Sequence, residues 1–197
     1  MTDPGGSATP LVRVQAAVVR VREAFVLHKF GKLAHEKYRS EASPALRGML
    51  AAPDPKDGWV DFDLFIEAIA LADRLFAAGD LRTAWDIGRF AASYNQGFWR
   101  ALVMKRVGPV LIMRMGSMVW SRHYDSGKTV IEETGKNEIV LQILDFARPH
   151  RAHCLSVMGW MAGIMELGPR TDVRVEEVRC RLDGGAACSV RCKWEPA

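Results

Sequence analysis

The stretch 173–194, VRVEEVRCRLDGGAACSVRCKW, decides the fold of the C-terminal half of this chain. Apolar residues, many of them valine, alternate with polar ones from Val173 to Leu182. The same alternation resumes from Cys188 to Trp194. Between the two runs, Asp183-Gly184-Gly185 has the composition of a turn. The stretch therefore predicts an antiparallel β-hairpin.

Working outward from the hairpin, Arg148-Pro149 opens a helical segment that runs to about Glu166 and is stopped by Gly168-Pro169. Before it, residues 129–133 and 138–144 are short and β-branched, with a turn-like segment between them. The C-terminal half therefore predicts a β-β-α-β-β antiparallel-sheet region.

The N-terminal half is mainly helical. Residues 11–21 begin as an alternating strand and pass into a helix over 22–36, and Ser43-Pro44 opens a short helix. Apolar residues at three-and-four spacing predict a helix over 62–76, with Asp61 as its cap, and a second helix from Asp80 to about residue 99. Helical sequence resumes over 110–120. The fold class is α+β, with a flexible tail at 1–10 and a single domain at 11–197.

Composition and charge restrict the class of protein. The 197 residues are 49% hydrophobic and 25% charged, as in a globular domain, and no apolar run approaches the roughly 20 residues of a membrane span. The net charge is +4, and the locally basic segment from Arg13 through Arg22 to Arg47 is interpreted as a solvated face, not a nucleic-acid site. The N-terminus has no signal-peptide pattern, so the chain and its cysteines are expected to lie in the reducing cytoplasm.

The four cysteines all lie from Cys154 onward. Cys180 and Cys188 bracket the hairpin turn, and Cys154, near the start of the preceding helix, can reach the same end of the sheet. Three thiols and one carboxylate, Glu177, are a ligand set typical of structural zinc. Because residues three apart in a regular strand face opposite ways, Glu177 can be a ligand only if the strand has a bulge or starts late. Alternatively, the fourth ligand is Glu176, His153 or Cys192, or the cysteines are ordinary buried residues.

This spacing, Cys154, then Glu177-Val178-Arg179-Cys180, then Cys188, resembles the 4-vinyl reductase domain over about residues 110–194. The resemblance implies a zinc held by Cys154, Glu177, Cys180 and Cys188. Residues 59–76, Gly79-Asp80, 88–94 and 120–124 resemble a large paralogous family of myxobacterial proteins. That family is taken as a divergent relative of the same fold, to which haem-NO-binding domains and Golgi tethering subunits are also related.

A zone rich in methionine and tryptophan is the candidate ligand site. Methionine fills irregular pockets and adaptable interfaces, so the zone indicates a lipophilic cavity or a dimer surface, with plain core packing as the alternative. His123-Tyr124-Asp125 is interpreted as a structural polar cluster at a helix end. The candidate ligand-binding residues are Met118, Trp120, Met158, Trp160 and Met161.

These observations predict a non-catalytic, zinc-stapled regulatory module that binds a small hydrophobic ligand, a partner protein, or both. No nucleophile is paired with a base, and no dinucleotide-binding glycine pattern is present. A homodimer formed through helical surface is also expected. The alternatives are an enzyme or accessory protein of tetrapyrrole (vinyl reductase) metabolism and a purely structural interaction subunit.

Overall fold

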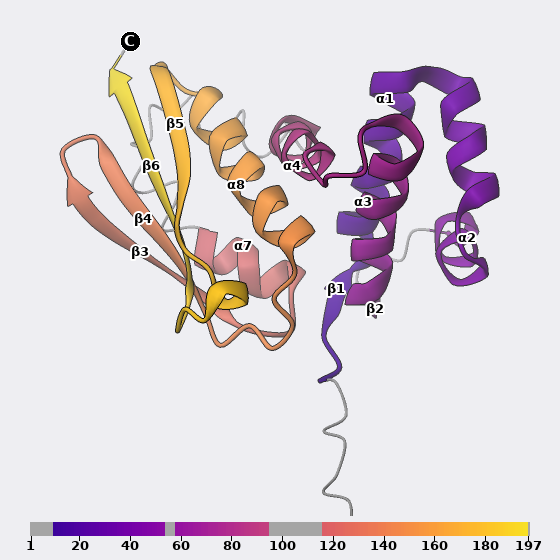
Figure 1. The fold of residues 1–197 in the computed structure, drawn as a ribbon, viewed down its shortest axis with the longest axis horizontal. Helices are drawn as coiled ribbons and strands as arrows, with labels where there is room; N and C mark the ends of the chain where they lie inside the picture. The colour runs from indigo at the N-terminus through magenta and orange to yellow at the C-terminus, as the bar shows by residue number, and fades with distance from the viewer. Residues whose placement is uncertain (1–9, 54–57, 95–115, 197) are drawn as a thin grey trace, which may run out of the picture.

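The computed structural model describes residues 10–53, 58–94 and 116–196. Figure 1 shows an N-terminal group of helices beside a C-terminal sheet that is packed against a long helix. The α+β class predicted from the sequence, helices first and antiparallel strands after them, is confirmed. The helices of the described part are α1 (Ala16–Glu41), α2 (Pro44–Ala51), α3 (Phe62–Phe76), α4 (Thr83–Tyr94), α7 (Gly116–His123) and α8 (Arg151–Glu166).

The strands form two antiparallel sheets. The smaller sheet pairs β1 (Arg13–Gln15) with β2 (Trp59–Asp61). The larger sheet has the strand order β3-β4-β6-β5, and α8 packs against it (Figure 1). The predicted hairpin is its β5-β6 pair, closed by a 3₁₀ turn over Arg181–Asp183. The strands of this sheet are β3 (Lys128–Gly135), β4 (Glu138–Leu144), β5 (Arg170–Arg179) and β6 (Cys188–Pro196).

Two helix starts that the sequence predicts are confirmed by their caps. The Ser43 hydroxyl accepts a hydrogen bond from the Leu46 amide at 3.1 Å, and Pro44 follows it at the first helical position. The Asp61 carboxylate accepts from the Asp63 amide at 2.8 Å at the start of α3. Both side chains satisfy backbone donors that the first turn of a helix leaves without partners.

The expected strand over residues 11–21 is wrong, because β1 covers only Arg13–Gln15 and α1 begins at Ala16. Val19, Phe25 and Val26 are buried at helical spacing, and this longer periodicity overrides the alternation of the preceding valines. The expected helical segments at 95–99 and 110–115 lie outside the described residues.

Helices α4 and α8 touch backbone to backbone. A Cβ atom at Gly88 would lie 2.0 Å from the carbonyl oxygen of Ser156, and one at Gly159 would lie 2.0 Å from the carbonyl oxygen of Trp85. No side chain larger than hydrogen fits at either position unless the helices move apart. The two glycines therefore set the distance between the two helices.

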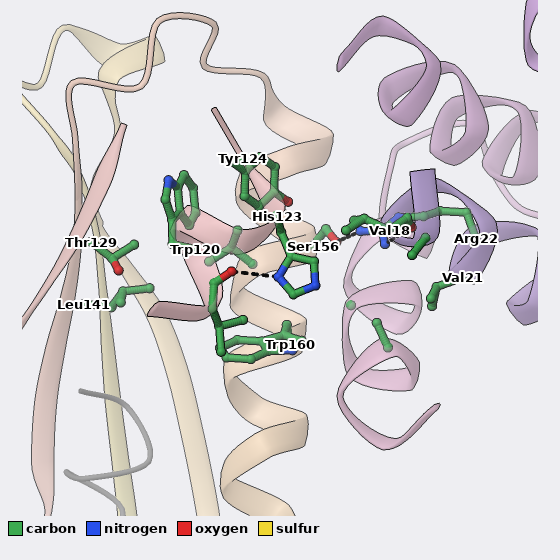
Figure 2. Close-up of a pocket in the computed structure, with 15 residues that line it drawn as sticks. Val18, Val21, Arg22, Trp120, His123, Tyr124, Thr129, Leu141, Ser156 and Trp160 are labelled. Atoms are coloured by element: carbon green, nitrogen blue, oxygen red, sulfur yellow. Dashed lines mark hydrogen bonds between the residues drawn. The ribbon is translucent and has the colours of Figure 1, made fainter. Parts of the chain in front are cut away.

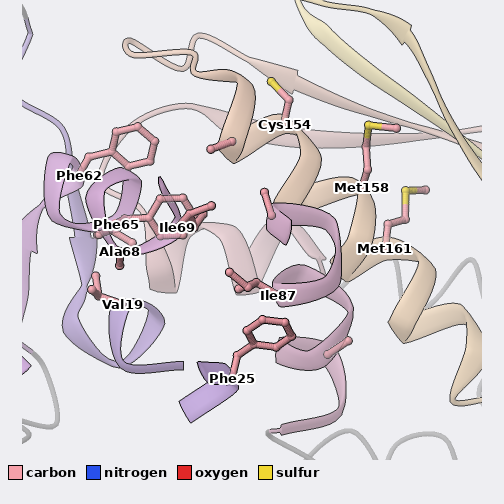
Figure 3. Close-up of a cluster of buried hydrophobic side chains, with 14 of the residues drawn as sticks. Val19, Phe25, Phe62, Phe65, Ala68, Ile69, Ile87, Cys154, Met158 and Met161 are labelled. Carbon is pink, nitrogen blue, oxygen red and sulfur yellow. The ribbon is translucent and has the colours of Figure 1, made fainter. Parts of the chain in front are cut away.

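An aromatic cluster joins the helical and the sheet-containing parts of the core, and Figure 3 shows two of its members, Phe62 and Phe65, among other buried side chains. At its centre lies His153 of α8, a buried ring whose centroid is 4.7–5.7 Å from those of five neighbouring aromatic rings. Burial lowers the pKa of His153 to about 3, so this ring is neutral and packs as an aromatic group. The aromatic cluster consists of Phe62, Phe65, Trp120, Tyr124, Phe146 and His153.

The chain leaving α7 is bonded to β1. The Asp125 carboxylate accepts hydrogen bonds from the backbone N–H and from the Nε of Arg13, both at 2.7 Å. Next to them, Val14 pairs with Tyr124 in an antiparallel bridge. The N-terminal strand is thereby fixed to the end of α7. Among the described helices, none combines the length and the apolar character required to cross a membrane.

Candidate functional site: a polar-ended cavity and a thiol cluster

A cavity of about 140 Å³ lies between α1, α4, α7, α8 and the first strands of the larger sheet (Figure 2). Its wall is mainly apolar, and a few polar side chains reach it from four different elements. The apolar lining residues are Ala17, Val18, Val21, Ala91, Val119, Trp120, Leu141, Val157 and Trp160. The polar ones are Arg22, His123, Tyr124, Thr129 and Ser156. Mainly apolar walls with a few placed polar groups are typical of small-molecule sites.

Arg22 is a buried cation at the cavity wall. Its residue is only 4% exposed, and its guanidinium carbon lies 4.2 Å from the centre of the Phe65 ring. Nη1 donates to the Val18 carbonyl at 2.6 Å and Nη2 donates to the Ser156 hydroxyl at 3.0 Å, while Nε is buried without a hydrogen-bond partner. Burial lowers the pKa of Arg22 to about 10, so the side chain still carries its charge at neutral pH.

His123 is held in one tautomer. Its Nδ1 lies 2.7 Å from the carbonyl oxygen of Val119, and burial lowers its pKa, so the ring is neutral and Nδ1 is the donating nitrogen. Nε2 therefore keeps its lone pair and can accept a hydrogen bond or bind a metal. Figure 2 shows this ring at the cavity, on the last turn of α7.

Tyr124 places a second neutral polar group at the cavity. Its ring stacks on Trp120 with centroids 4.4 Å apart. Burial raises the pKa of Tyr124 to about 12, so its hydroxyl keeps its proton and can both donate and accept. The described lining of the cavity thus combines one positive charge, that of Arg22, with hydroxyl and imidazole groups that carry none.

A second constellation brings three cysteines together. The sulfurs of Cys154 on α8, Cys180 after β5 and Cys188 at the start of β6 lie within 4.8 Å of one another, with Cys154 and Cys180 3.9 Å apart. A hydrogen bond from the Cys154 thiol lowers the pKa of Cys188. The three residues, which we call the thiol cluster, are all buried.

Glu177 pairs with Arg151, and one of its carboxylate oxygens also lies within 4.8 Å of the Cys180 sulfur. Its two carboxylate oxygens accept from Nη1 of Arg151 at 2.7 and 2.8 Å. The strand register shifts between Glu177 and Arg179, which is the irregularity that a Glu177–Cys180 ligand pair requires. The set of Cys154, Glu177, Cys180 and Cys188 as metal ligands stays a prediction.

The alternative fourth ligands lie apart from the thiol cluster. Glu176 pairs with Arg191 at 2.8 Å, His153 belongs to the aromatic cluster, and Cys192 is fully buried opposite Ile139 in the sheet.

The predicted ligand-binding residues separate into three environments. Trp120 and Trp160 line the cavity. Met158 and Met161 are buried in the core and are not among the cavity-lining residues, and Met118 is 68% exposed. Only the two tryptophans of the predicted set come together at the cavity.

Sequence reasoning missed the polar end of the cavity. Arg22 was assigned to a solvated basic face, and that assignment is wrong because the residue is buried. The signal was present in the helical spacing, since Arg22 falls on the same face as the buried Val19, Phe25 and Val26. Ser156 carried no comparable signal.

The comparisons with known proteins rest on structure. No family model matches the sequence, and no curated protein sequence matches it. Solved H-NOX structures match nearly the whole chain. The Fe(II) H-NOX protein from S. oneidensis is 14% identical, with 92% of this chain and 96% of that chain covered and a TM-score of 0.66. An oxygen-binding H-NOX domain related to soluble guanylate cyclases, in its oxygen complex, is 13% identical, with 92% and 96% covered and a TM-score of 0.67. The Fe(II) unliganded H-NOX protein from K. algicida is 12% identical, with 93% and 97% covered and a TM-score of 0.65.

These matches correct several predictions made from the sequence. The assignment to the 4-vinyl reductase domain is wrong, and with it the alternative of a vinyl reductase enzyme or accessory protein, because the matched structures are H-NOX proteins. The predictions of a zinc-stapled module and of a structural zinc are likewise wrong, because the matched structures concern haem and the ligation state of its iron, not zinc. In this chain, moreover, the carboxylate expected to complete the zinc site is paired with Arg151. At these identities the likeness establishes the fold, and the fold of this chain is that of H-NOX domains.

Proposed function

We propose that this chain is a small-molecule receptor with the H-NOX fold, and that its ligand occupies the cavity between α1, α4, α7 and α8. The observation that carries the proposal is the convergence of Arg22, His123, Tyr124 and Ser156 on one mainly apolar cavity. Polar groups brought together from separate elements can fix the orientation of a ligand that the apolar wall desolvates. The matched oxygen-binding H-NOX domain also has a small ligand.

Haem must be considered as a ligand, because the matched H-NOX structures include one that concerns haem distortion in that family. The donor chemistry at the cavity suits iron, since a neutral His123 with a free Nε2 is a common axial ligand. The space does not suit it. A cavity of about 140 Å³ is close to the ~150 Å³ that admits benzene or xenon and well below the ~300 Å³ at the lower end of ligand pockets. A tetrapyrrole is built from several rings, each close to benzene in size.

The aromatic cluster beside the cavity offers no slot for a macrocycle either. Its rings lie in contact, with Trp120 stacked on Tyr124 at 4.4 Å and His153 stacked on Phe146 at 4.7 Å. Within the described residues, neither this cavity nor the aromatic cluster therefore fits haem. A ligand about as large as one six-membered ring does fit.

Binding of single-ring probes to the purified chain tests the proposal. Phenol, benzyl alcohol, benzoate and benzylamine would be titrated by ligand-observed NMR and calorimetry. Ala91→Phe fills the cavity from α4 and should abolish binding of every probe that the wild type takes up. Ala51→Phe makes the same change at an exposed position of α2 and should leave binding unchanged.

Two outcomes would overturn the proposal. The first is that none of the four probes binds, or that Ala91→Phe binds them as the wild type does. The second is stoichiometric uptake of haem by the wild-type chain, with an iron-ligand spectrum that Ala51→Phe keeps and His123→Ala loses. That result would replace direct binding by a haem-based mechanism.

A further inference from the structure

The starting observation is a buried positive charge whose neighbours are neutral. The groups that contact the Arg22 guanidinium are the Val18 carbonyl, the Ser156 hydroxyl and the face of the Phe65 ring. Among the described residues no carboxylate forms an ion pair with it, and the ionisable groups that act on its pKa are the hydroxyls of Tyr124 and Tyr38. Several other arginines do pair with carboxylates, as Arg151 does with Glu177 and Arg39 with Glu23.

Such an arrangement is costly unless an anion completes it. A buried charge is normally paired and hydrogen-bonded, because removing an ion from water is unfavourable when nothing compensates the loss of its hydration. A guanidinium has five N–H donors in a rigid fork. In Arg22 the hydrogen bonds to Val18 and Ser156 use two of its nitrogens, and Nε has no partner although it is buried.

The surroundings restrict the class of anion. The ring of His123 is neutral, so among the described lining residues Arg22 is the one that carries a positive charge. One positive charge matches a monoanion better than a phosphate dianion, and the planar guanidinium fork matches the planar geometry of a carboxylate. The remaining wall, including Val119, Trp120 and Leu141, is apolar and suits a hydrocarbon or aromatic body.

We propose that the ligand is a small carboxylic acid, of about the size of benzoate, whose carboxylate pairs with Arg22 at the Ser156 side of the cavity. This inference rests on the proposed function, since it names the ligand class of the same cavity. Its apolar body lies among Val119, Trp120 and Leu141, the last two of which are labelled in Figure 2. The hydroxyl of Tyr124 and Nε2 of His123 remain to recognise a second polar group on the ring.

The test compares two probes of nearly equal shape, benzoate and the neutral benzyl alcohol, on the full chain by calorimetry at neutral pH. Wild type should bind benzoate at least about tenfold more tightly, which is the contribution expected of one charge-assisted hydrogen bond. Arg22→Met should remove this preference and keep the affinity for benzyl alcohol. Arg39→Met, a matched change on the same helix outside the cavity, should bind both probes as the wild type does.

Failure of the inference differs from failure of the proposed function. Equal affinity of wild type for the two probes, with both excluded by Ala91→Phe, would refute the carboxylate and leave the cavity as a binding site. Retention of the benzoate preference in folded Arg22→Met would refute the role of Arg22. Because the comparison of probes needs wild type alone, the carboxylate stays testable even if Arg22→Met does not fold.

Discussion

The contact between α4 and α8 makes a strong prediction for Gly159→Ala. The new Cβ would lie 2.0 Å from the Trp85 carbonyl oxygen, 2.8 Å from its carbon and 3.0 Å from its Cα, whereas ordinary contact begins at 3.4 Å. These are backbone atoms, which cannot rotate away, so the helices must separate by about 1.4 Å at this point. Overpacking of this kind costs about 3 kcal/mol, and the better helix propensity of alanine returns about 1 kcal/mol. The net loss of unfolding free energy is about 2 kcal/mol.

For a chain of 197 residues this loss corresponds to a Tm lower by about 4–8 °C. The matched control is Gly48→Ala in α2, where no atom lies within 4 Å of the added Cβ and the backbone is helical. The control should raise the Tm by about 2 °C, because alanine loses less conformational entropy on folding than glycine. Differential scanning calorimetry of the two variants and wild type measures both shifts. A Gly159→Ala protein that melts at or above the wild-type temperature would refute the close backbone contact as a determinant of stability.

Three further predictions concern other parts of the chain. Asp73 is 1% exposed and accepts hydrogen bonds from the amides of Leu81 and Thr83 at 2.9 and 3.2 Å. Asp73→Ala should therefore lower the free energy of unfolding measured in urea by about 2 kcal/mol or more, and Asp73→Asn by less. An Asp73→Ala protein as stable as the wild type would contradict this. Tyr124 keeps its proton to about pH 12 in the folded state, whereas an unfolded tyrosine releases it near pH ~10. The folded state therefore binds more protons between these values, and stability should fall as the pH rises through them, by at most about 3 kcal/mol. Urea titrations at several alkaline pH values should show a smaller fall in Tyr124→Phe, and an equal fall would argue against the buried hydroxyl. The homodimer remains a prediction, which light scattering can test. Leu33 of α1 is 83% exposed, and Leu33→Glu should convert a dimer to a monomer if α1 forms the interface. A monomeric wild-type protein would refute the dimer itself.

The elements of this fold could largely be predicted because their determinants are local. Ser43 and Asp61 bind amides two or three residues further along the chain, and the β5-β6 turn lies at Asp183 and Gly184. Such signals act within one turn of a helix or one hairpin. Where two local periodicities competed, at the start of α1, the sequence interpretation failed by extending the strand.

The cavity could not be predicted because its determinants are not local. Arg22 and Ser156 are 134 positions apart and become hydrogen-bond partners only when α1 packs near α8. The cysteine pattern was misleading for a related reason. Spacing predicts that three sulfurs meet, and they do lie together, but spacing does not report that Arg151 engages the carboxylate of Glu177.

The contacts between β1 and the end of α7 connect the cavity wall to the N-terminal strand. Tyr124 contributes its side chain to the cavity wall and its backbone to the bridge with Val14. The carboxylate of the adjacent Asp125 accepts a hydrogen bond from Arg13. β1 in turn pairs with β2, which leads directly into α3. A ligand that displaces Tyr124 must therefore strain or break the β1 pairing. A shift of Tyr124 would therefore be transmitted to the N-terminal strand.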